Sequence, residues 1–420
     1  MSTQLTDFPL ELLEMVPGHV AVGADLKALS LTSSIFREPC QRILFSNITP
    51  IAIAPSRSPF YNHTFRVLNK RLDDMPHLVK YITTVNLILR RDDPREHSYA
   101  PSIDALLGRL THVRHIVLCG PTIPPGALMP PIQSILVSDW DKMLLPLKTA
   151  ALELVAKLST AGSGTLRRIA IEDVTNISWN DMQLLLAGAP EVILDNVSVV
   201  PGPSPDAATQ EPPPPGSIRE ISLHGSGSVA AMLLRPELAS LTRDLRRITL
   251  ACDEDSSVVE LCAARSESIE HVRLRSNHPL SDAGPSQSFR DAAFPRLRHL
   301  EIVLAVRDLQ QCTQMTPVWL QFATAFLHGS ALTTLSLELT HAVANDGGDL
   351  TETYTRAAQQ SLSRLDQLVG GQSALKTVCF AVEFTGHGQG MSTSAHAEAF
   401  WRAVRGVMIN AETRGFLRFV

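Results

Sequence analysis

The chain has 420 residues, of which 44% are apolar and 19% are charged, a composition typical of a globular protein. Its formal net charge of −5 and isoelectric point near 6.3 offer no electrostatic attraction to nucleic acid or to an anionic membrane, so neither is expected as a partner. No stretch approaches the roughly 20 uninterrupted apolar residues of a membrane-spanning helix.

The sequence also lacks the signals of export, of metal binding and of common catalytic sites. Asp7, Glu11 and Glu14 precede any apolar run long enough for a signal peptide, so we expect a cytoplasmic or nuclear protein. The six cysteines form no Cys-x-x-Cys pair and no zinc-type spacing with histidine. No phosphate-binding loop, nucleophile elbow or His-Glu-x-x-His motif occurs. We therefore expect no metal, no cofactor and no catalytic residue.

Residues 8–48 are predicted to form three short helices. The first has Pro9 in its opening turn, where the missing N–H needs no partner, and it ends at Pro17-Gly18. The second runs from about Ala24 to Leu31, with leucines three residues apart on one face. Helices this short cannot bury much apolar surface alone, so they must pack on the rest of the chain or on a partner.

The third helix carries apolar residues at helical spacing between Phe36 and Leu44. A proline inside a helix costs about 3 kcal/mol. We therefore expect the regular part of this helix to begin near Glu38, with Pro39 in its first turn.

The same stretch resembles an F-box, and is similar to that of a large divergent family found in fungi. The resemblance lies in Phe8-Pro9, Glu11-Leu12-Leu13, Asp25-Leu26, Leu29-Ser30-Leu31, Ser33 and Phe36-Arg37. The first helix is shorter than is usual in the family, and Phe36 stands where many F-boxes have tryptophan.

In that family the F-box docks on the adaptor subunit of a cullin-RING (SCF-type) ubiquitin ligase. The resemblance therefore implies a helical F-box-like domain over residues 1–50 that binds this adaptor. The positions that match the docking pattern are Pro9, Leu12, Leu13, Val16, Leu26, Leu29 and Leu31. An alternative is an N-terminal helical cap whose apolar stripe packs on the body of the protein.

Residues 51–77 are expected to form a connector with one short helix, and a repeated pattern then fills residues 78–420. The pattern is six residues long. An apolar residue comes first, aliphatic residues stand fourth and sixth, and the second, third and fifth positions vary. It predicts eleven strands, because the final alternation places two aliphatics on one strand face. The pattern occurs at 82–87, 113–118, 132–137, 166–171, 189–194, 218–223, 245–250, 269–274, 297–302, 332–337 and 375–380.

Amphipathic helical segments separate these strands, and successive strands from Leu166 to Leu297 start 23 to 29 residues apart. A strand and a helix in about 20 to 29 residues is the period of a leucine-rich repeat, which this pattern resembles. The asparagine that would follow each strand is absent. We thus predict an α/β fold, an irregular leucine-rich-repeat-like solenoid of parallel strands alternating with helices.

A doubly wound α/β domain would also alternate strands and helices. We favour the solenoid because eleven units are many for one such sheet. The proline-rich residues 201–216 are predicted to be a solvated loop, since proline removes backbone donors.

In a solenoid, the residues that flank the aliphatics of each strand line an extended concave surface. This places ten candidate cargo-binding residues on one surface: Arg168, Glu172, Glu220, His224, His271, Arg273, Arg275, His299, Glu301 and Glu338. His271, Arg273, Arg275 and His299 form a local basic cluster in an acidic chain, which would suit an acidic or phosphorylated segment.

The sequence thus favours a non-enzymatic substrate-recognition subunit of a ubiquitin ligase. One alternative is a leucine-rich-repeat scaffold without a ligase role. Another is an α/β enzyme, which would need a deep pocket with converging polar side chains.

Overall fold

A computed structural model describes most of the chain and divides it into two compact units. We call them the first unit (Met1–Gly216) and the second unit (Ser217–Val420). Of the proline-rich residues 201–216, only Pro201 and Gly202 are described. The described residues are 15–20, 22–51, 63–89, 98–120, 138–160, 165–202, 217–251, 256–276, 287–306, 321–327, 330–342, 350–385 and 393–419.

The first unit begins with the expected short helices. Residues 15–18 are helical, and this helix ends at Gly18, as predicted from Pro17-Gly18. Helix α2 (Gly23–Thr32) matches the predicted second helix to within one residue at each end. Helix α3 (Ser34–Leu44) follows after a single residue, Ser33.

The prediction for the start of the third helix was wrong. Helix α3 begins at Ser34, and Pro39 therefore lies in its interior. The Ser33 side chain caps the helix by accepting the N–H of Ile35, which stabilises a start five residues before the proline. Phe36, Pro39 and Cys40 are buried on one side of the helix. Burial of these side chains offsets part of the cost of a proline in a helix.

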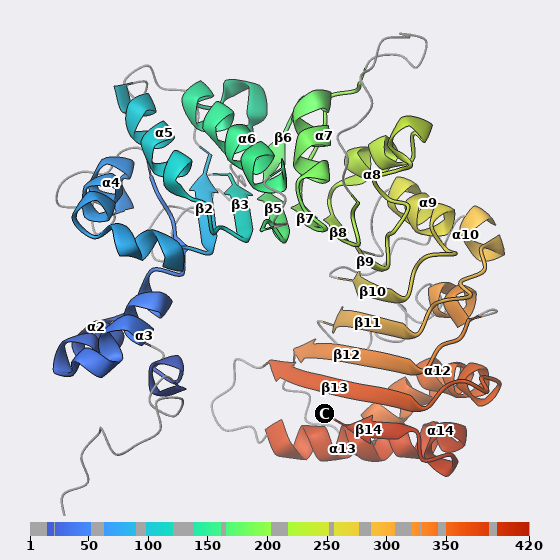
Figure 1. The fold of residues 1–420 in the computed structure, drawn as a ribbon. Helices are drawn as coiled ribbons and strands as arrows, with labels where there is room; N and C mark the ends of the chain where they lie inside the picture. The colour runs from blue at the N-terminus through green and yellow to red at the C-terminus, as the bar shows by residue number, and fades with distance from the viewer. Residues whose placement is uncertain are drawn as a thin grey trace, which may run out of the picture. The chain divides into compact units, whose positions relative to one another are not determined.

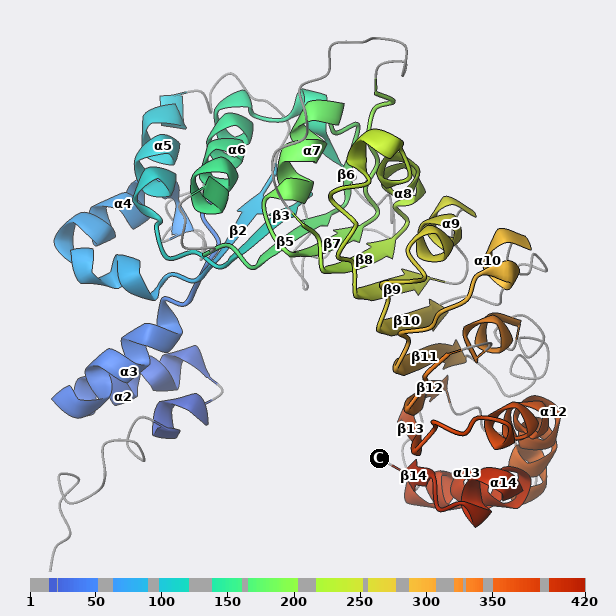
Figure 2. The ribbon, with the colours of Figure 1, turned by 45° about the vertical axis from the view of Figure 1, so that its right-hand side comes forward.

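Five strands of the first unit form a parallel sheet in chain order. They are β1 (Asn47–Ile48), β2 (Thr84–Ile88), β3 (His115–Cys119), β5 (Arg168–Glu172) and β7 (Glu191–Asp195). Strands β4 (Ser138–Asp139) and β6 (Val174–Thr175) form a separate small sheet. The helical elements are α4 (Phe65–Asp74), η3 (Pro76–Tyr81), α5 (Ala100–Arg109), η5 (Trp140–Lys142), α6 (Leu145–Thr160) and α7 (Trp179–Ala187). Helices α5, α6 and α7 lie side by side on one face of the sheet (Figures 1 and 2).

The second unit repeats this arrangement with seven described strands, also parallel and in chain order. They are β8 (Glu220–His224), β9 (Arg247–Ala251), β10 (His271–Ser276), β11 (His299–Val306), β12 (Thr334–Ala342), β13 (Thr377–Thr385) and β14 (Leu417–Phe419). The helical elements are α8 (Gly227–Leu233), η6 (Pro236–Leu238), α9 (Ser256–Ala264), α10 (Gln287–Asp291), residues 321–327, α12 (Leu350–Gly370), α13 (Thr393–Val407) and α14 (Ile409–Thr413).

The repeated pattern correctly predicted ten strands, and the eleventh, at 132–137, lies outside the described residues. Each observed strand starts two residues after the leading apolar residue of its pattern. That leading residue is buried in all ten cases, for example Ile82, Leu245 and Leu297. It therefore packs in the turn before the strand, while the two aliphatics of the strand pack beneath the helices.

The order of the strands distinguishes the predicted solenoid from its alternative, a doubly wound α/β domain. A doubly wound sheet reverses its strand order at a switch point, where ligands bind. Among the described strands, neither unit contains such a reversal, since the strands of the large sheet lie side by side in chain order and only β4 and β6 form a separate sheet. The observed order is that of stacked strand–helix units.

A buried carboxylate ties the last helices of the second unit together. Asp366 on α12 is only 4% exposed. Its two oxygens accept the backbone N–H groups of Asn410, at 2.9 Å, and Ala411, at 3.0 Å. These N–H groups belong to the first turn of α14, which has no partner for them within the helix. Asp366 thus caps α14 from a neighbouring helix.

We predict that Asp366→Ala lowers the free energy of unfolding by about 1–3 kcal/mol, because two buried donors lose their acceptor. Asp366→Asn keeps one carbonyl acceptor and should cost less. Chemical denaturation of the full chain, followed by circular dichroism, measures both. Equal stability of Asp366→Ala and the wild type would contradict the capping role.

Candidate functional site

The N-terminal helices expose more large apolar side chains than any other described part of the chain. Eight large hydrophobic residues are exposed among the described residues, and five of them lie between residues 15 and 43. We call these five the N-terminal apolar residues: Met15, Val16, Val22, Leu31 and Ile43. The other three, Leu145, Val200 and Ile409, are scattered. A concentration of exposed apolar residues is a feature of protein interaction sites.

The same helices contain a small core of their own. Leu26, Phe36 and Cys40 are buried in it, and Val20, Leu29, Ile35 and Leu44 pack around them. Of the predicted adaptor-binding residues, Leu26 and Leu29 therefore serve this core, whereas Val16 and Leu31 are exposed. Leu31 is 85% exposed. Pro9, Leu12 and Leu13 lie outside the described residues.

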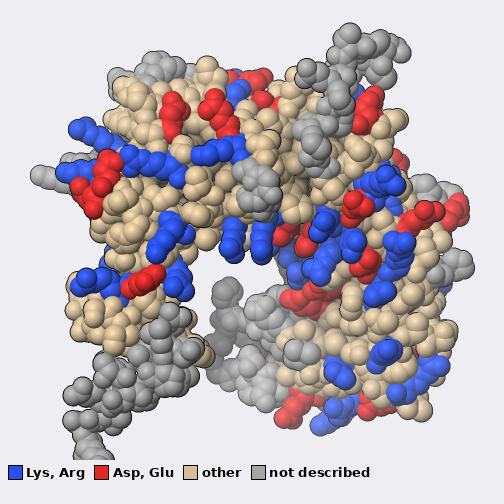
Figure 3. Space-filling model, viewed as in Figure 1, with Lys and Arg blue, Asp and Glu red and all other residues tan. Residues whose placement is uncertain are grey.

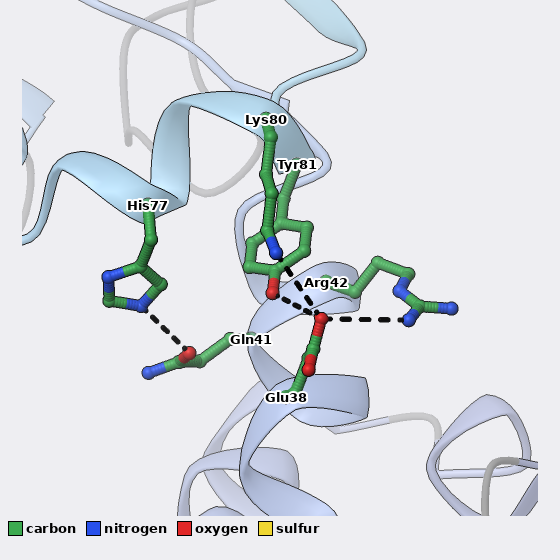
Figure 4. Close-up of polar contacts among 6 residues, drawn as sticks. All are labelled: Glu38, Gln41, Arg42, His77, Lys80 and Tyr81. Carbon is green, nitrogen blue, oxygen red and sulfur yellow. Dashed lines mark hydrogen bonds and ion pairs between the residues drawn. The ribbon is translucent and has the colours of Figure 1, made fainter.

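Polar contacts join this helical segment to the rest of the first unit (Figure 4). Glu38 on α3 accepts a hydrogen bond of 2.7 Å from the Tyr81 hydroxyl and lies 3.5 Å from the Lys80 ammonium. These two groups, Tyr81 first, hold the pKa of Glu38 below its usual range. Gln41 contacts His77 at 3.3 Å.

The backbone provides a second attachment. The N–H groups of Thr83 and Thr84 donate to the carbonyl of Ser46, and β1 then pairs with β2. The helical segment therefore continues directly into the parallel sheet. Its described side-chain hydrogen bonds and ion pairs to η3 come from Glu38 and Gln41 of α3.

The strands of the second unit present one face that their helices do not cover. Along β8 to β13, buried aliphatics alternate with half-exposed or exposed residues on the opposite face, which we call the open face. Parallel pairing in register aligns the open-face residues of neighbouring strands in rows, such as His271 beside His299 and Arg273 beside Glu301. Eight of the ten predicted cargo-binding residues lie on this open face: Glu220, His224, His271, Arg273, Arg275, His299, Glu301 and Glu338.

The remaining two, Arg168 and Glu172, lie at the two ends of β5 in the first unit. Arg168 forms an ion pair with Glu191, its partner in register on β7. Glu172 is paired in register with Asp195. Burial, together with the charges of Asp195 and Asp173, raises the pKa of Glu172. The ten predicted residues are therefore divided between the two units, with two in the first and eight in the second.

Arg273 occupies the centre of a charge network on the open face. Its guanidinium lies 3.2 Å from Glu301 on β11 and 3.3 Å from Glu338 on β12. The His271 ring lies 3.8 Å from Glu301. The Arg273 side chain is 31% exposed, so solvent screens these pairs less than fully exposed ones. His271, followed by the charge of Arg273, holds the pKa of Glu301 below its usual value.

The expectation of a basic cluster at His271, Arg273, Arg275 and His299 is therefore corrected. Register places Glu301 beside Arg273, and the sequence pattern did not reveal this pairing. The centre of the open face is a network of both charges, and Figure 3 shows Lys and Arg side chains interspersed with Asp and Glu over the second unit. Arg275 is exposed and forms no ion pair with another described residue.

Sequence reasoning missed a set of arginines at the amino-terminal ends of the strands. In the first unit these are Arg114, before β3, and Arg167, before β5. Figure 3 shows Lys and Arg side chains gathered near these ends of β3 and β5. In the second unit, Arg219, Arg246 and Arg298 hold the same position before β8, β9 and β11. The signal was present in the sequence, because the second position of the repeated pattern is arginine in five of its eleven copies.

Comparisons with models of known protein families and with curated proteins found no match. None of the described helices combines the length and apolar character needed to cross a membrane. Within the described ranges, no three His, Cys, Asp or Glu side chains are grouped closely enough to hold a metal ion.

We predict that Arg273→Met lowers the free energy of unfolding by about 1–2 kcal/mol, between the values typical of exposed and of buried ion pairs. The loss follows because Glu301 and Glu338 would face each other without the guanidinium between them. Arg275→Met is the matched control on the same strand and face, and should change stability by less than about 0.5 kcal/mol. Chemical denaturation compares the two, and equal effects would show that Arg273 does not hold the network together.

Acid should destabilise the second unit partly through His299. Burial, then the charges of His271, Arg247 and Arg298, lowers the pKa of His299 below its usual value. As the pH falls below about 6.5, the unfolded chain binds this proton more readily than the folded one, so stability decreases. His299→Gln should therefore lose less stability than the wild type between pH 7.5 and pH 5.5. Denaturation measured at several pH values tests this. Equal losses of unfolding free energy in the wild type and in His299→Gln would rule out this contribution.

Proposed function

We propose that this protein is the substrate-recognition subunit of a cullin-RING (SCF-type) ubiquitin ligase. In this proposal the N-terminal helices dock on the adaptor subunit, and the strand–helix units bind the cargo. The observation that carries the proposal is the concentration of exposed apolar side chains on a helical segment that already has its own core.

The contacts of the helical segment favour docking over capping. A helical cap would bury its apolar stripe against the body of the protein. Here hydrogen bonds from Tyr81 to Glu38 and between His77 and Gln41 join η3 to α3, while Leu31 and the other N-terminal apolar residues stay exposed. The attachment through β1 would hold a docked adaptor in a fixed orientation relative to the first unit.

The strand–helix units suit an irregular leucine-rich-repeat-like solenoid. Within each unit, the described strands are parallel and follow chain order, and their leading apolar residues are buried. The spacing of 23 to 29 residues between Leu166 and Leu297 supports the same assignment. Such arrays bind partners on the surface lined by their strands. The open face of the second unit is the corresponding surface here.

Leu31→Asp is expected to weaken adaptor binding by about 10- to 100-fold. A leucine buried in an interface contributes about 1.5–3 kcal/mol, and burying aspartate adds a desolvation cost. Leu31 is a better probe than Leu29, because Leu29 packs on the helical core and its substitution would disturb folding. Ile409→Asp is the matched control, since Ile409 is 62% exposed on α14 of the second unit.

Tagged full-length chains are purified from cell extract, and the recovered adaptor and cullin subunits are quantified by mass spectrometry. Recovery with the wild type and Ile409→Asp, together with loss in Leu31→Asp, supports the proposal. Absence of adaptor and cullin from the wild-type sample would favour a repeat scaffold without a ligase role. Full recovery with Leu31→Asp would show that this side chain is not in the interface.

A further inference from the structure

Arginines recur at one register position along the amino-terminal edge of the second unit's sheet. This position is the residue directly before each strand. It is occupied in successive strands by Arg219, Arg246, Glu270, Arg298, Thr333 and Lys376. We call Arg219, Arg246, Arg247 and Arg298 the arginine row; Arg247 is the first residue of β9.

Backbone hydrogen bonds place the members of this row next to one another. The N–H groups of Arg246 and Arg247 both donate to the carbonyl of Arg219. The N–H of Glu270 donates to the carbonyl of Arg246, and the N–H of Arg298 donates to the carbonyl of Glu270. Because neighbouring strands are about 4.8 Å apart, the row extends over about 14 Å from Arg219 to Arg298.

The side chains of the row remain available to an external anion. Arg246 and Arg247 are 61% and 62% exposed, and their ion pairs with Glu270 and Glu220 are long, at 3.8 and 3.6 Å. Arg219 and Arg298 are exposed and pair with no carboxylate among the described residues. Four positive charges thus face two carboxylates, in a chain whose net charge is −5.

His299 lies close to the arginine row. Its ring belongs to the row of open-face residues next to the arginines, beside His271. After burial, the charges that lower its pKa are those of His271, Arg247 and Arg298. The arginine row therefore lies close enough to the open face for its charges to act on His299.

We propose that the arginine row binds an anionic segment of a peptide, carrying glutamate, aspartate or phosphoserine side chains. Guanidinium groups bind carboxylates and phosphates with paired, charge-assisted hydrogen bonds. The proposal deepens the cargo-binding part of the proposed function and rests on it only for the role of the peptide as cargo. It places the anion at the amino-terminal edge, where Arg219 and Arg298 pair with no described carboxylate, and not at Arg273, which already pairs with Glu301 and Glu338.

The dimensions of the row favour a short peptide over a nucleic acid. An extended peptide rises about 3.3 Å per residue, so four or five residues span the 14 Å of the row. Nucleic-acid surfaces are usually larger and occur on basic domains. The acidic net charge of this chain would oppose the approach of a long polyanion.

Fluorescence anisotropy with the full-length chain tests the proposal. The probes are fluorescein-labelled peptides of one length, with a centre of five glutamates, of phosphoserines alternating with glycine, or of five glutamines. The variant Arg219→Gln with Arg298→Gln removes the two arginines that have no described ion pair. Arg364→Gln with Arg402→Gln is the matched control, because it removes two exposed arginines from α12 and α13 of the same unit.

The wild type and the control are expected to bind an acidic probe in preference to the glutamine probe. The row variant should bind that probe about three- to tenfold more weakly, the loss expected for two partly exposed ion pairs. Raising the salt concentration from 50 to 500 mM should weaken wild-type binding. Comparison of the glutamate and phosphoserine probes identifies the preferred anion.

The inference is overturned if the wild type binds neither acidic probe, or if the row and control variants lose affinity equally. It is also overturned if the row binds a single-stranded RNA oligonucleotide and no acidic peptide. These outcomes are independent of the adaptor. Failed peptide binding with intact adaptor recovery rejects only this inference, whereas row-dependent peptide binding without adaptor recovery rejects the ligase role and leaves the row as a peptide-binding surface.

Discussion

Each strand of this protein depends on its neighbours to cover its apolar side chains. A strand of five residues, such as β2 or β9, carries two aliphatics on one face and a third just before it, and a single helix cannot enclose them. Stacking of successive strand–helix units buries all three. Within each unit, the strands of the large sheet are then hydrogen-bonded side by side in chain order. Parallel order, one covered face and one open face are consequences of this single requirement.

The open face is therefore free to carry charge without a cost to the core. In the second unit its residues are aligned by register, so that opposite charges on adjacent strands meet, as Arg273 and Glu301 do. Such cross-strand pairs hold the centre of the face together. The arginines at the strand ends lie where a strand has just begun, and the register there brings few carboxylates opposite them. The same geometry thus produces a neutralised centre and a positively charged edge.

The N-terminal helices distribute their side chains differently from the strand–helix units. They are too short to build a large core, and they combine a small core around Phe36 with a polar attachment through Glu38. Apolar side chains that fit neither role, Leu31 above all, remain in solvent. A partner that covers them would supply the burial that these helices lack. This division of side chains between core, attachment and surface is what the proposed docking on an adaptor requires.

Local patterns in the sequence were sufficient to identify most of the strands, because a two-residue alternation after a leading apolar residue can be recognised within six residues. Ten strands between β2 and β13 were found in this way, and the ends of α2 were found to within one residue. The short strands β1, β4, β6 and β14 were missed, since two or three residues carry no periodicity. The start of α3 was misplaced because the burial of Pro39, which offsets the cost of a proline in a helix, is a property of packing.

For the charges of the open face, too, the local pattern decided one part and the tertiary structure the other. The sequence determined which residues face outward, but only the register of the strands decided that Arg273 meets two carboxylates whereas Arg219 and Arg298 meet none among the described residues. Pairing across strands joins residues tens of positions apart, and no local pattern contains that information.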